Sequence, residues 1–143
     1  MVGLSDGVYY IDFNSTDYAG NLELTNTITV ILDNTPPETT ITIGEPKYVR
    51  DTVYVTPETP FTLKVSGGEG SGVSSAYNIY NNNNYNSGWL NYTEPFNLMD
   101  LADAVYTIEY YSTDNLGNVD ATKSIQITLF SWNYIFTDSY GKV

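Results

Sequence analysis

Two pairs of carboxylate side chains flank short turns in this sequence. Asp114 and Asp120 flank one turn, and Asp17 and Glu23 flank the other. Paired carboxylates can act as a general acid and a general base. Turn aspartates, however, accept hydrogen bonds from loop amides, and the same pair at two matching turns is more typical of a scaffold than of a catalytic site. We therefore predict that these carboxylates are structural and that the chain is not an enzyme.

Calcium is the metal ion that these residues would suit. The chain has no cysteine and no histidine, so only oxygen ligands are available. The candidate ligands are Asp114, Asn115, Asn118 and Asp120, joined by Glu69 if its loop lies nearby. Their spacing is not that of an EF-hand loop. We expect no cofactor other than this calcium ion, if it binds.

Aromatic side chains beside an asparagine run, residues 81–84, could stack on sugar rings. The candidates are Trp89, Tyr92, Tyr80 and Tyr85. They predict a carbohydrate-binding surface if they are exposed together. In the alternative interpretation, Trp89 fills the core and the tyrosines lie on a sheet face, with each ring packed and each hydroxyl in water.

Two triplets fit the acceptor pattern for N-glycosylation, at Asn14 and at Asn91. Such triplets also arise by chance in a chain this rich in asparagine and threonine. The glycine-rich stretch at residues 67–72 is not a phosphate-binding loop, because it lacks the lysine of that motif and no helical pattern follows it.

The charge of the chain excludes several partners. The formal net charge is −12, with 5 basic residues. Nucleic-acid binding requires lysine and arginine to neutralise phosphates, so we expect no nucleic-acid partner. No apolar run is long enough to span a bilayer, and we expect no membrane insertion. The 14 tyrosines and few lysines suggest an exported protein.

One pattern occurs twice. Asp6 matches Asp103 and Leu32 matches Leu129, so that 103 − 6 gives a spacing of 97 residues that holds without a gap. This spacing is about the length of one β-sandwich domain and far longer than a solenoid repeat. Each copy has the pattern of a strand, a tight Gly-Asn turn and a returning strand, as in a β-hairpin.

Alternating residues in each copy predict one apolar and one wet face, as in an antiparallel sheet. The residues expected to face the core are Tyr106, Ile108 and Tyr110 in the second copy and Tyr9, Ile11 and Phe13 in the first. Further strands are predicted over residues 39–43, 61–65 and 75–80, with short ones over 48–56 and 89–92. No stretch has a helical period.

These patterns divide the chain into three parts. Residues 1–33 are predicted to be the C-terminal hairpin of a truncated preceding repeat, 34–129 a complete repeat, and 130–143 an aromatic tail or the start of another domain. An isolated hairpin is marginally stable in water, so we expect something to cover the apolar face of the first one.

Four stretches resemble the tandem Ig-like repeats of large bacterial and archaeal exported proteins. They are the linker Asn34-Thr-Pro-Pro37, the loop 67–72 followed by Val73, the stretch Asp103-Ala-Val-Tyr106, and the turn Ser112-Thr-Asp-Asn-Leu-Gly-Asn118. The third stretch also resembles the tyrosine corner of immunoglobulin-type domains. The resemblance implies an all-β, Ig-like or fibronectin-III-like antiparallel β-sandwich, preceded by a hairpin.

The same resemblance implies an extracellular or cell-surface module that acts as a spacer, stalk or adhesion element. One alternative is a carbohydrate-binding or accessory module of an exported hydrolase. The other is a filament subunit that assembles by strand exchange. The partners implied are neighbouring repeats of the same protein, another copy of the chain, or a polysaccharide.

Overall fold

The computed structural model describes residues 3–67 and 72–131, and these residues form an all-β structure without a helix. The chain divides into two compact units, Met1–Thr35 and Pro36–Val143. Glu69 and the aromatic tail from residue 132 onward, which the sequence analysis singled out, lie outside the described residues.

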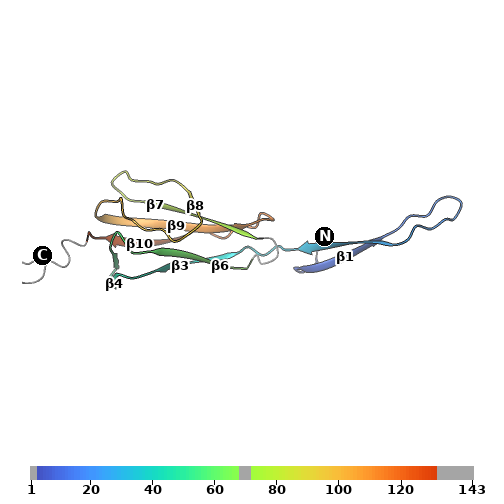
Figure 1. Cartoon of the computed structure of the whole chain (residues 1–143), viewed down its shortest axis with the longest axis horizontal. Coiled ribbons are helices and arrows are strands. Elements are labelled where there is room, and N and C mark those ends of the chain that lie inside the picture. The colour runs from blue at the N-terminus through green and yellow to red at the C-terminus, as the bar shows by residue number, and fades with distance from the viewer. Residues whose placement is uncertain (1–2, 68–71, 132–143) are drawn as a thin grey trace, which may run out of the picture. The chain divides into compact units, whose positions relative to one another are not determined.

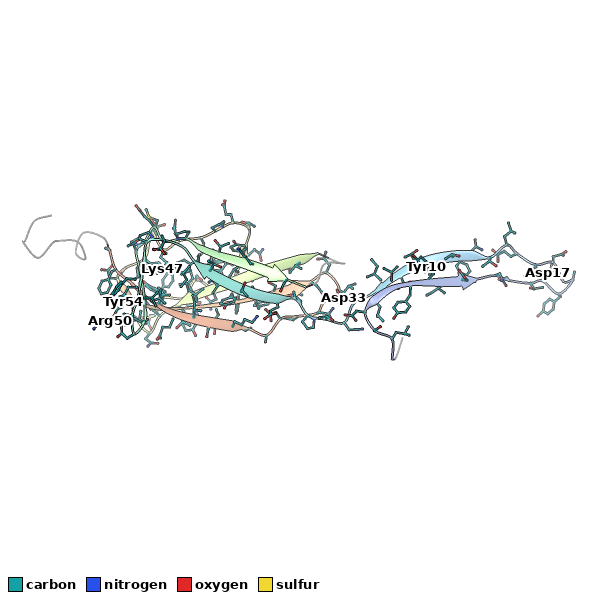
Figure 2. The ribbon with its side chains drawn as sticks, turned by 90° about the horizontal axis from the view of Figure 1, so that it is seen from below. Tyr10, Asp17, Asp33, Lys47, Arg50 and Tyr54 are labelled. Atoms are coloured by element: carbon teal, nitrogen blue, oxygen red, sulfur yellow. The ribbon has the colours of Figure 1, made fainter. Side chains whose placement is uncertain are left out.

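The first unit is a β-hairpin. Strand β1 (Gly7–Phe13) pairs antiparallel with β2 (Asn26–Leu32), in a register that runs from Gly7 opposite Leu32 to Phe13 opposite Asn26. Figure 2 labels Tyr10 on this hairpin and Asp17 in the turn beyond its strands. Within the described residues, β1 has no strand partner other than β2.

The second unit contains the other eight strands. They are β3 (Glu38–Ile43), β4 (Lys47–Val49), β5 (Val53–Val55), β6 (Phe61–Ser66), β7 (Val73–Tyr80), β8 (Leu90–Tyr92), β9 (Ala104–Asp114) and β10 (Lys123–Leu129). Six of them form one sheet in the order β4-β5-β10-β9-β7-β8, while β3 and β6 form another. Figure 1 shows the β3–β6 pair as a layer facing β7, β9 and β10, which is consistent with a β-sandwich.

The core of the second unit lies between these layers. Tyr106, Ile108 and Tyr110 on β9 are buried, which confirms the alternation predicted from the sequence. Phe61 on β6, in the facing layer, belongs to the same core cluster as Tyr106 and Ile108, and Ile127 on β10 is completely buried. Apolar residues at every second position thus place one face of each central strand in the core.

One prediction for this unit was wrong in detail, and one alternative interpretation does not hold. Residues 48–56 form the separate strands β4 and β5, because the chain turns between them and the Arg50 N–H donates to the Thr52 carbonyl at 3.0 Å. Trp89 does not fill the core. Its side chain is 47% exposed and lies edge-on to Tyr111, with ring centroids 4.9 Å apart, because it precedes the edge strand β8.

Candidate functional site

The turn after β9 is organised by the carboxylate of Asp114. Its Oδ1 accepts hydrogen bonds from the backbone N–H of Leu116 at 2.9 Å and of Asn118 at 2.8 Å. Its Oδ2 accepts a third from the Asn118 side-chain amide at 2.8 Å. Gly117 has a φ of +91°, which a residue with a Cβ rarely adopts. The carboxylate therefore fixes a tight turn, with the donors from Leu116 and Asn118 and the positive φ of Gly117 matching its geometry.

The turn after β1 repeats these contacts. Asp17 Oδ1 accepts from the backbone N–H of Ala19 and of Asn21, both at 2.9 Å, and Oδ2 accepts from the Asn21 amide at 2.8 Å. Gly20 has a φ of +87°. The spacing of 97 residues thus holds for individual hydrogen bonds as well as for residue types.

The protonation of these carboxylates follows from their partners. Burial favours the neutral form of Asp114, but the hydrogen bonds from Asn118 and Leu116 outweigh it, so the pKa of Asp114 lies below its usual 3.8. Hydrogen bonds from the Asn21 side chain and backbone lower the pKa of the exposed Asp17 in the same way. Both carboxylates are therefore charged acceptors at neutral pH, whereas a general acid needs a raised pKa.

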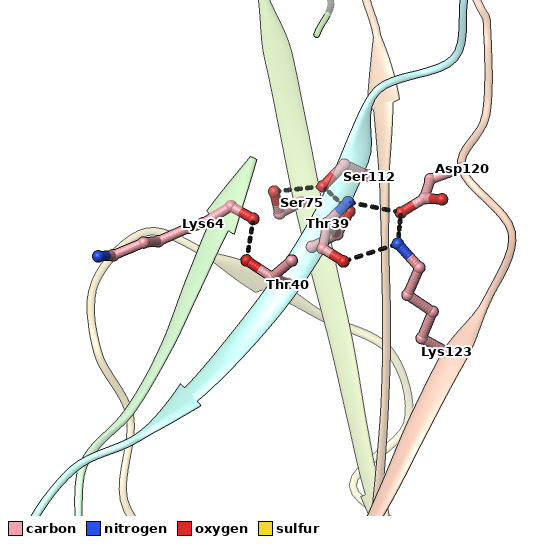
Figure 3. Close-up of polar contacts among 7 residues, drawn as sticks. All are labelled: Thr39, Thr40, Lys64, Ser75, Ser112, Asp120 and Lys123. Carbon is pink, nitrogen blue, oxygen red and sulfur yellow. Dashed lines mark hydrogen bonds and ion pairs between the residues drawn. The ribbon is translucent and has the colours of Figure 1, made fainter. Parts of the chain in front are cut away.

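A polar cluster holds the beginning of β3, and we call it the polar clamp: the buried Thr39, Ser112 and Asp120 with the partly buried Ser75 and Lys123. The Thr39 N–H donates to Asp120 Oδ2 at 2.8 Å, and the Lys123 amine donates to the Thr39 carbonyl at 2.7 Å (Figure 3). Lys123 also donates to Asp120 Oδ2 at 3.2 Å. One lysine and one carboxylate thereby satisfy both backbone groups of a single residue on β3.

Three hydroxyl groups extend the polar clamp across the sandwich. Ser112 Oγ lies 2.8 Å from Thr39 Oγ1 and 2.7 Å from Ser75 Oγ (Figure 3). Thr39 and Ser112 are completely buried. These hydroxyl groups join β3, β7 and β9 by hydrogen bonds. They lie at the point where the polypeptide enters the second unit. Unsatisfied buried polar groups are costly, so this network also specifies the register of β3.

The pKa of Asp120 is set within the polar clamp. Burial raises it, but the hydrogen bonds from the Thr39 side chain and backbone and from Lys123 lower it more, and the net result is a pKa below the usual 3.8. Asp120 is therefore ionised beside Lys123, where its charge is needed for the ion pair.

A second carboxylate contact closes the other end of each hairpin. Asp103 Oδ1 accepts from the backbone N–H of Ser131 at 2.8 Å, and Asp6 Oδ1 accepts from that of Asn34 at 2.9 Å. The difference 131 − 34 is again 97, although the sequences of the two copies already diverge there. Residue types match only as far as Leu129, whereas this contact uses a backbone N–H, which any residue except proline can provide.

The predicted calcium ligands are brought together only in part. No group of three or more acidic, histidine or cysteine side chains suited to a metal ion occurs within the described residues. Asp114 and Asp120 are engaged in the hydrogen bonds above, and the Asn115 N–H donates to the Gly72 carbonyl at 3.0 Å. Asn118 belongs to the Asp114 turn, and Glu69 lies outside the described residues. Calcium binding stays a prediction.

The predicted sugar-binding aromatics point to different neighbours. Tyr85 lies edge-on to the core residue Tyr106, with ring centroids 5.9 Å apart, and Tyr92 lies edge-on to Phe96 at 6.5 Å. The Tyr80 hydroxyl donates to Glu109 at 3.4 Å. These three side chains are half-buried, and of the four candidates only Trp89 is exposed.

Both predicted glycosylation sites are on the surface. Asn14 follows β1 and Asn91 lies in the edge strand β8, and both side chains are exposed. The Asn14 amide donates to Thr25 Oγ1 at 3.4 Å. Their modification stays a prediction.

A groove that the sequence analysis missed lies where β10 ends. Its volume is about 430 Å³, and it is lined by Pro46, Lys47, Tyr48, Arg50, Tyr54, Val55, Thr56 and Phe130. The rings of Tyr54 and Phe130 stack with centroids 5.7 Å apart. Figure 2 labels Lys47, Arg50 and Tyr54 at this end of the unit. Its walls come from residues 46–56 and from Phe130, which are far apart in the sequence, so no local pattern predicts it.

The sequence matches no protein-family model, and a search of curated proteins finds no significant relative. The repeat within the chain is therefore the comparison that bears on function.

No helix long and apolar enough to cross a membrane occurs in the described part of the chain.

Proposed function

We propose that the chain is a non-catalytic part of an extracellular or cell-surface protein built from tandem Ig-like repeats, in which it acts as a spacer or adhesion element. One observation carries this proposal: the hydrogen bonds of the Asp114 turn recur at Asp17 with a constant spacing of 97 residues. A repeat in which individual hydrogen bonds recur indicates two copies of one module. The expected partners of such a module are neighbouring repeats.

A second pair of contacts supports the Ig-like character of the module. The Tyr106 hydroxyl donates to the Ala102 carbonyl at 2.9 Å, and the Tyr9 hydroxyl donates to the Ser5 carbonyl at 2.7 Å. A tyrosine that bonds back to the backbone a few residues upstream is the tyrosine corner of immunoglobulin-type sandwiches.

The path of the chain through the second unit supports a load-bearing role. The chain enters at Thr39, beside the β9–β10 turn. It leaves after Leu129, which pairs with Ala104 at the end of the hairpin farthest from that turn. Tension between these points acts along β3 and β10. It therefore loads the β3–β6, β10–β9 and β10–β5 hydrogen bonds together, rather than one pair after another.

Single-molecule pulling tests this role directly. The chain has no cysteine, so paired cysteine handles are unique. With Glu38→Cys and Ser131→Cys, force runs along the strands, and we expect unfolding at high force in one step that releases roughly 300 Å of chain.

The control uses the same protein and a different direction. With Ala102→Cys and Ser131→Cys, both handles lie at the end where β9 begins and β10 finishes, so force peels β10 away pair by pair. We expect a much lower unfolding force. Equal forces in the two directions would contradict a fold arranged to carry tension.

Carbohydrate binding is the second candidate, favoured by the exposure of Trp89 on the rigid support of Tyr111. Stacking on a sugar would require this ring. Affinity electrophoresis against a panel of polysaccharides should then show retardation that Trp89→Ala removes and that Tyr18→Ala, at an exposed site in the first unit, does not. Retardation unaffected by Trp89→Ala would reject this surface.

A further inference from the structure

The two hairpins have the same internal contacts but different surroundings. Ile108 on β9 is completely buried, whereas Ile11, which is 97 residues earlier, is 40% exposed. Tyr110 is 7% exposed, and its equivalent Phe13 is 50% exposed. The first hairpin therefore presents to solvent the face that the second hairpin buries. The strands around the second hairpin show which element could cover such a face.

One edge of this face is covered by β7. It pairs antiparallel with β9 from Val73 opposite Asp114 to Tyr80 opposite Thr107, and within that register Ile79 lies opposite Ile108. Subtracting 97 transfers the register to β1, where Ile11 takes the place of Ile108. The corresponding edge of β1 carries no strand within the described residues, so its outward backbone groups are open to pairing.

Polar groups beside the edge of β1 match the same pattern. Ser15 is the equivalent of Ser112, whose hydroxyl bonds Ser75 on β7 at 2.7 Å. Ser15 is exposed, and its hydroxyl has no hydrogen-bond partner among the described side chains and backbone groups. Its carbonyl accepts from the Glu23 N–H at 2.8 Å, as that of Ser112 accepts from Asp120 at 2.9 Å.

The residues that hold β3 in the second unit also have counterparts. The Asn26 amide donates to Glu23 Oε1 at 2.9 Å, at the two positions that Lys123 and Asp120 occupy in the polar clamp. The Asn26 amide already donates to the Leu24 carbonyl at 3.3 Å, whereas the Glu23 carboxylate can accept from a further backbone N–H. Accepting a backbone N–H is the contact that Asp120 makes to Thr39 in the polar clamp.

We propose that the free edge of β1 is a strand-acceptor site, which an antiparallel strand of the same polypeptide with the side-chain pattern of β7 occupies. The strand places an apolar residue opposite Ile11, an aromatic residue opposite Phe13 and a small hydroxyl residue opposite Ser15. Backbone hydrogen bonds provide affinity, and the alternating side chains provide register. This inference rests on the proposed tandem-repeat function and adds the register and chemistry of the occupant.

A tethered strand tests the site in the full chain. The sequence of Val73–Tyr80 is fused ahead of Leu4 through a Gly/Ser linker of roughly ten residues, which gives a high effective concentration. In the transferred register the C-terminal end of the added strand lies opposite Tyr10, near the start of β1, so this linker can span the gap. Hydrogen exchange followed by NMR should show the β1 amides slowed by roughly tenfold or more.

Two matched variants of the acceptor make the result specific. Ile11→Glu places a charge on the face to be covered and should abolish the protection, whereas Tyr10→Glu lies on the opposite face and should leave it intact. A control tether with lysines in place of its tyrosine and isoleucine at the positions facing Phe13 and Ile11 should give no protection.

Several outcomes would overturn the proposal. Equal exchange rates with the native and lysine-substituted tethers would show that the edge does not select this strand, and protection of β9 instead of β1 would show that the tether displaces the resident β7. Protection of β1 in the unmodified chain that grows with concentration, together with a doubled mass by light scattering, would identify a second copy as the occupant. Both pairs of handles in the pulling experiment lie in the second unit, so that experiment tests only this unit, and its failure is distinguishable from failure here.

Discussion

At the scale of single residues, charged and hydroxyl groups act in this protein as fixed acceptors and donors for the backbone. Asp114 and Asp17 each fold a turn around one carboxylate, and Asp120 holds the start of β3. Tyr106 ties the beginning of β9 to the residues before it through its hydroxyl. The contacts of Asp114, Asp17 and Tyr106 lie within four residues of sequence, whereas the Asp120 contact joins two distant segments. Each of them is open to a single-residue test.

Removing the hydroxyl of Tyr106 should weaken the second unit. Tyr106→Phe keeps the buried ring but leaves the Ala102 carbonyl without this donor, and we expect the free energy of unfolding to fall by about 1 kcal/mol. Urea denaturation followed by tryptophan fluorescence measures it. Tyr10→Phe, at a side chain that is 72% exposed, is the control and should change nothing. Identical midpoints for the two variants would contradict a stabilising role for the hydrogen bond from Tyr106 to Ala102.

Stability should depend on the ionisation of Asp114 and Asp120. The pKa of each is lower in the folded chain than the usual 3.8, so the unfolded chain takes up protons first as the pH falls. The stabilisation is complete at pH values above about 5 and is lost as the pH falls below 3.8 and through the two folded pKa values.

Carboxyl ¹³C shifts measured by NMR should therefore titrate with midpoints below 3.8 for both aspartates. In parallel, Asp114→Asn combined with Asp120→Asn should be less stable at neutral pH and should lose less stability on acidification. An acid dependence as steep in this variant as in the parent chain would place the effect on other groups.

At the scale of elements, the same hairpin pattern occurs in two different surroundings. The β9–β10 hairpin is covered by β7, β5 and the facing β3–β6 layer, whereas β1 and β2 pair only with each other within the described residues. An apolar side chain stabilises a fold only by the area that it removes from water. The same residue type at the same hairpin position should therefore contribute differently to the two units.

Truncating equivalent isoleucines measures this difference. Ile108→Ala leaves a cavity in a fully buried site and should lower the free energy of unfolding by about 2–5 kcal/mol. Ile11→Ala, 97 residues earlier and 40% exposed, should cost less than about 1 kcal/mol. Differential scanning calorimetry of both variants gives the comparison. Similar losses would mean that the first hairpin is already covered in solution.

At the scale of the whole molecule, a net charge of −12 is distributed over a chain with few cations. Two ion pairs occur among the described residues, Lys47–Glu45 at 4.0 Å and Lys123–Asp120 at 3.2 Å. Most carboxylates therefore repel one another through solvent, and such repulsion destabilises a compact state.

Salt should stabilise this protein. Raising the ionic strength from about 0.01 M to about 0.15 M shortens the screening length from roughly 30 Å to 8 Å, so we expect the melting temperature to rise at neutral pH. The same addition at acidic pH, where protonation of carboxylates reduces the net negative charge, should raise it much less. A melting temperature that falls with salt at neutral pH would show that the two ion pairs outweigh the repulsion.

The sequence by itself determined most of the strands, which face of each central strand is apolar, and the repeat. Alternation fixes which side of a strand is apolar, and Asp-x-x-Gly-Asn fixes a turn, because both depend on neighbouring residues alone. Tyr106, Ile108 and Tyr110 were therefore predicted in the core, and Asp114 in the turn.

Only the tertiary structure decided the contacts between distant strands. The pairing of Asp120 and Lys123 with Thr39, the groove at Tyr54 and Phe130, and the exposure of Trp89 depend on which strands become neighbours. Tertiary structure also makes Ile108 buried and Ile11 exposed. Burial is a property of what covers a residue, and no pattern within 27 matched residues, 6–32 and 103–129, can encode it.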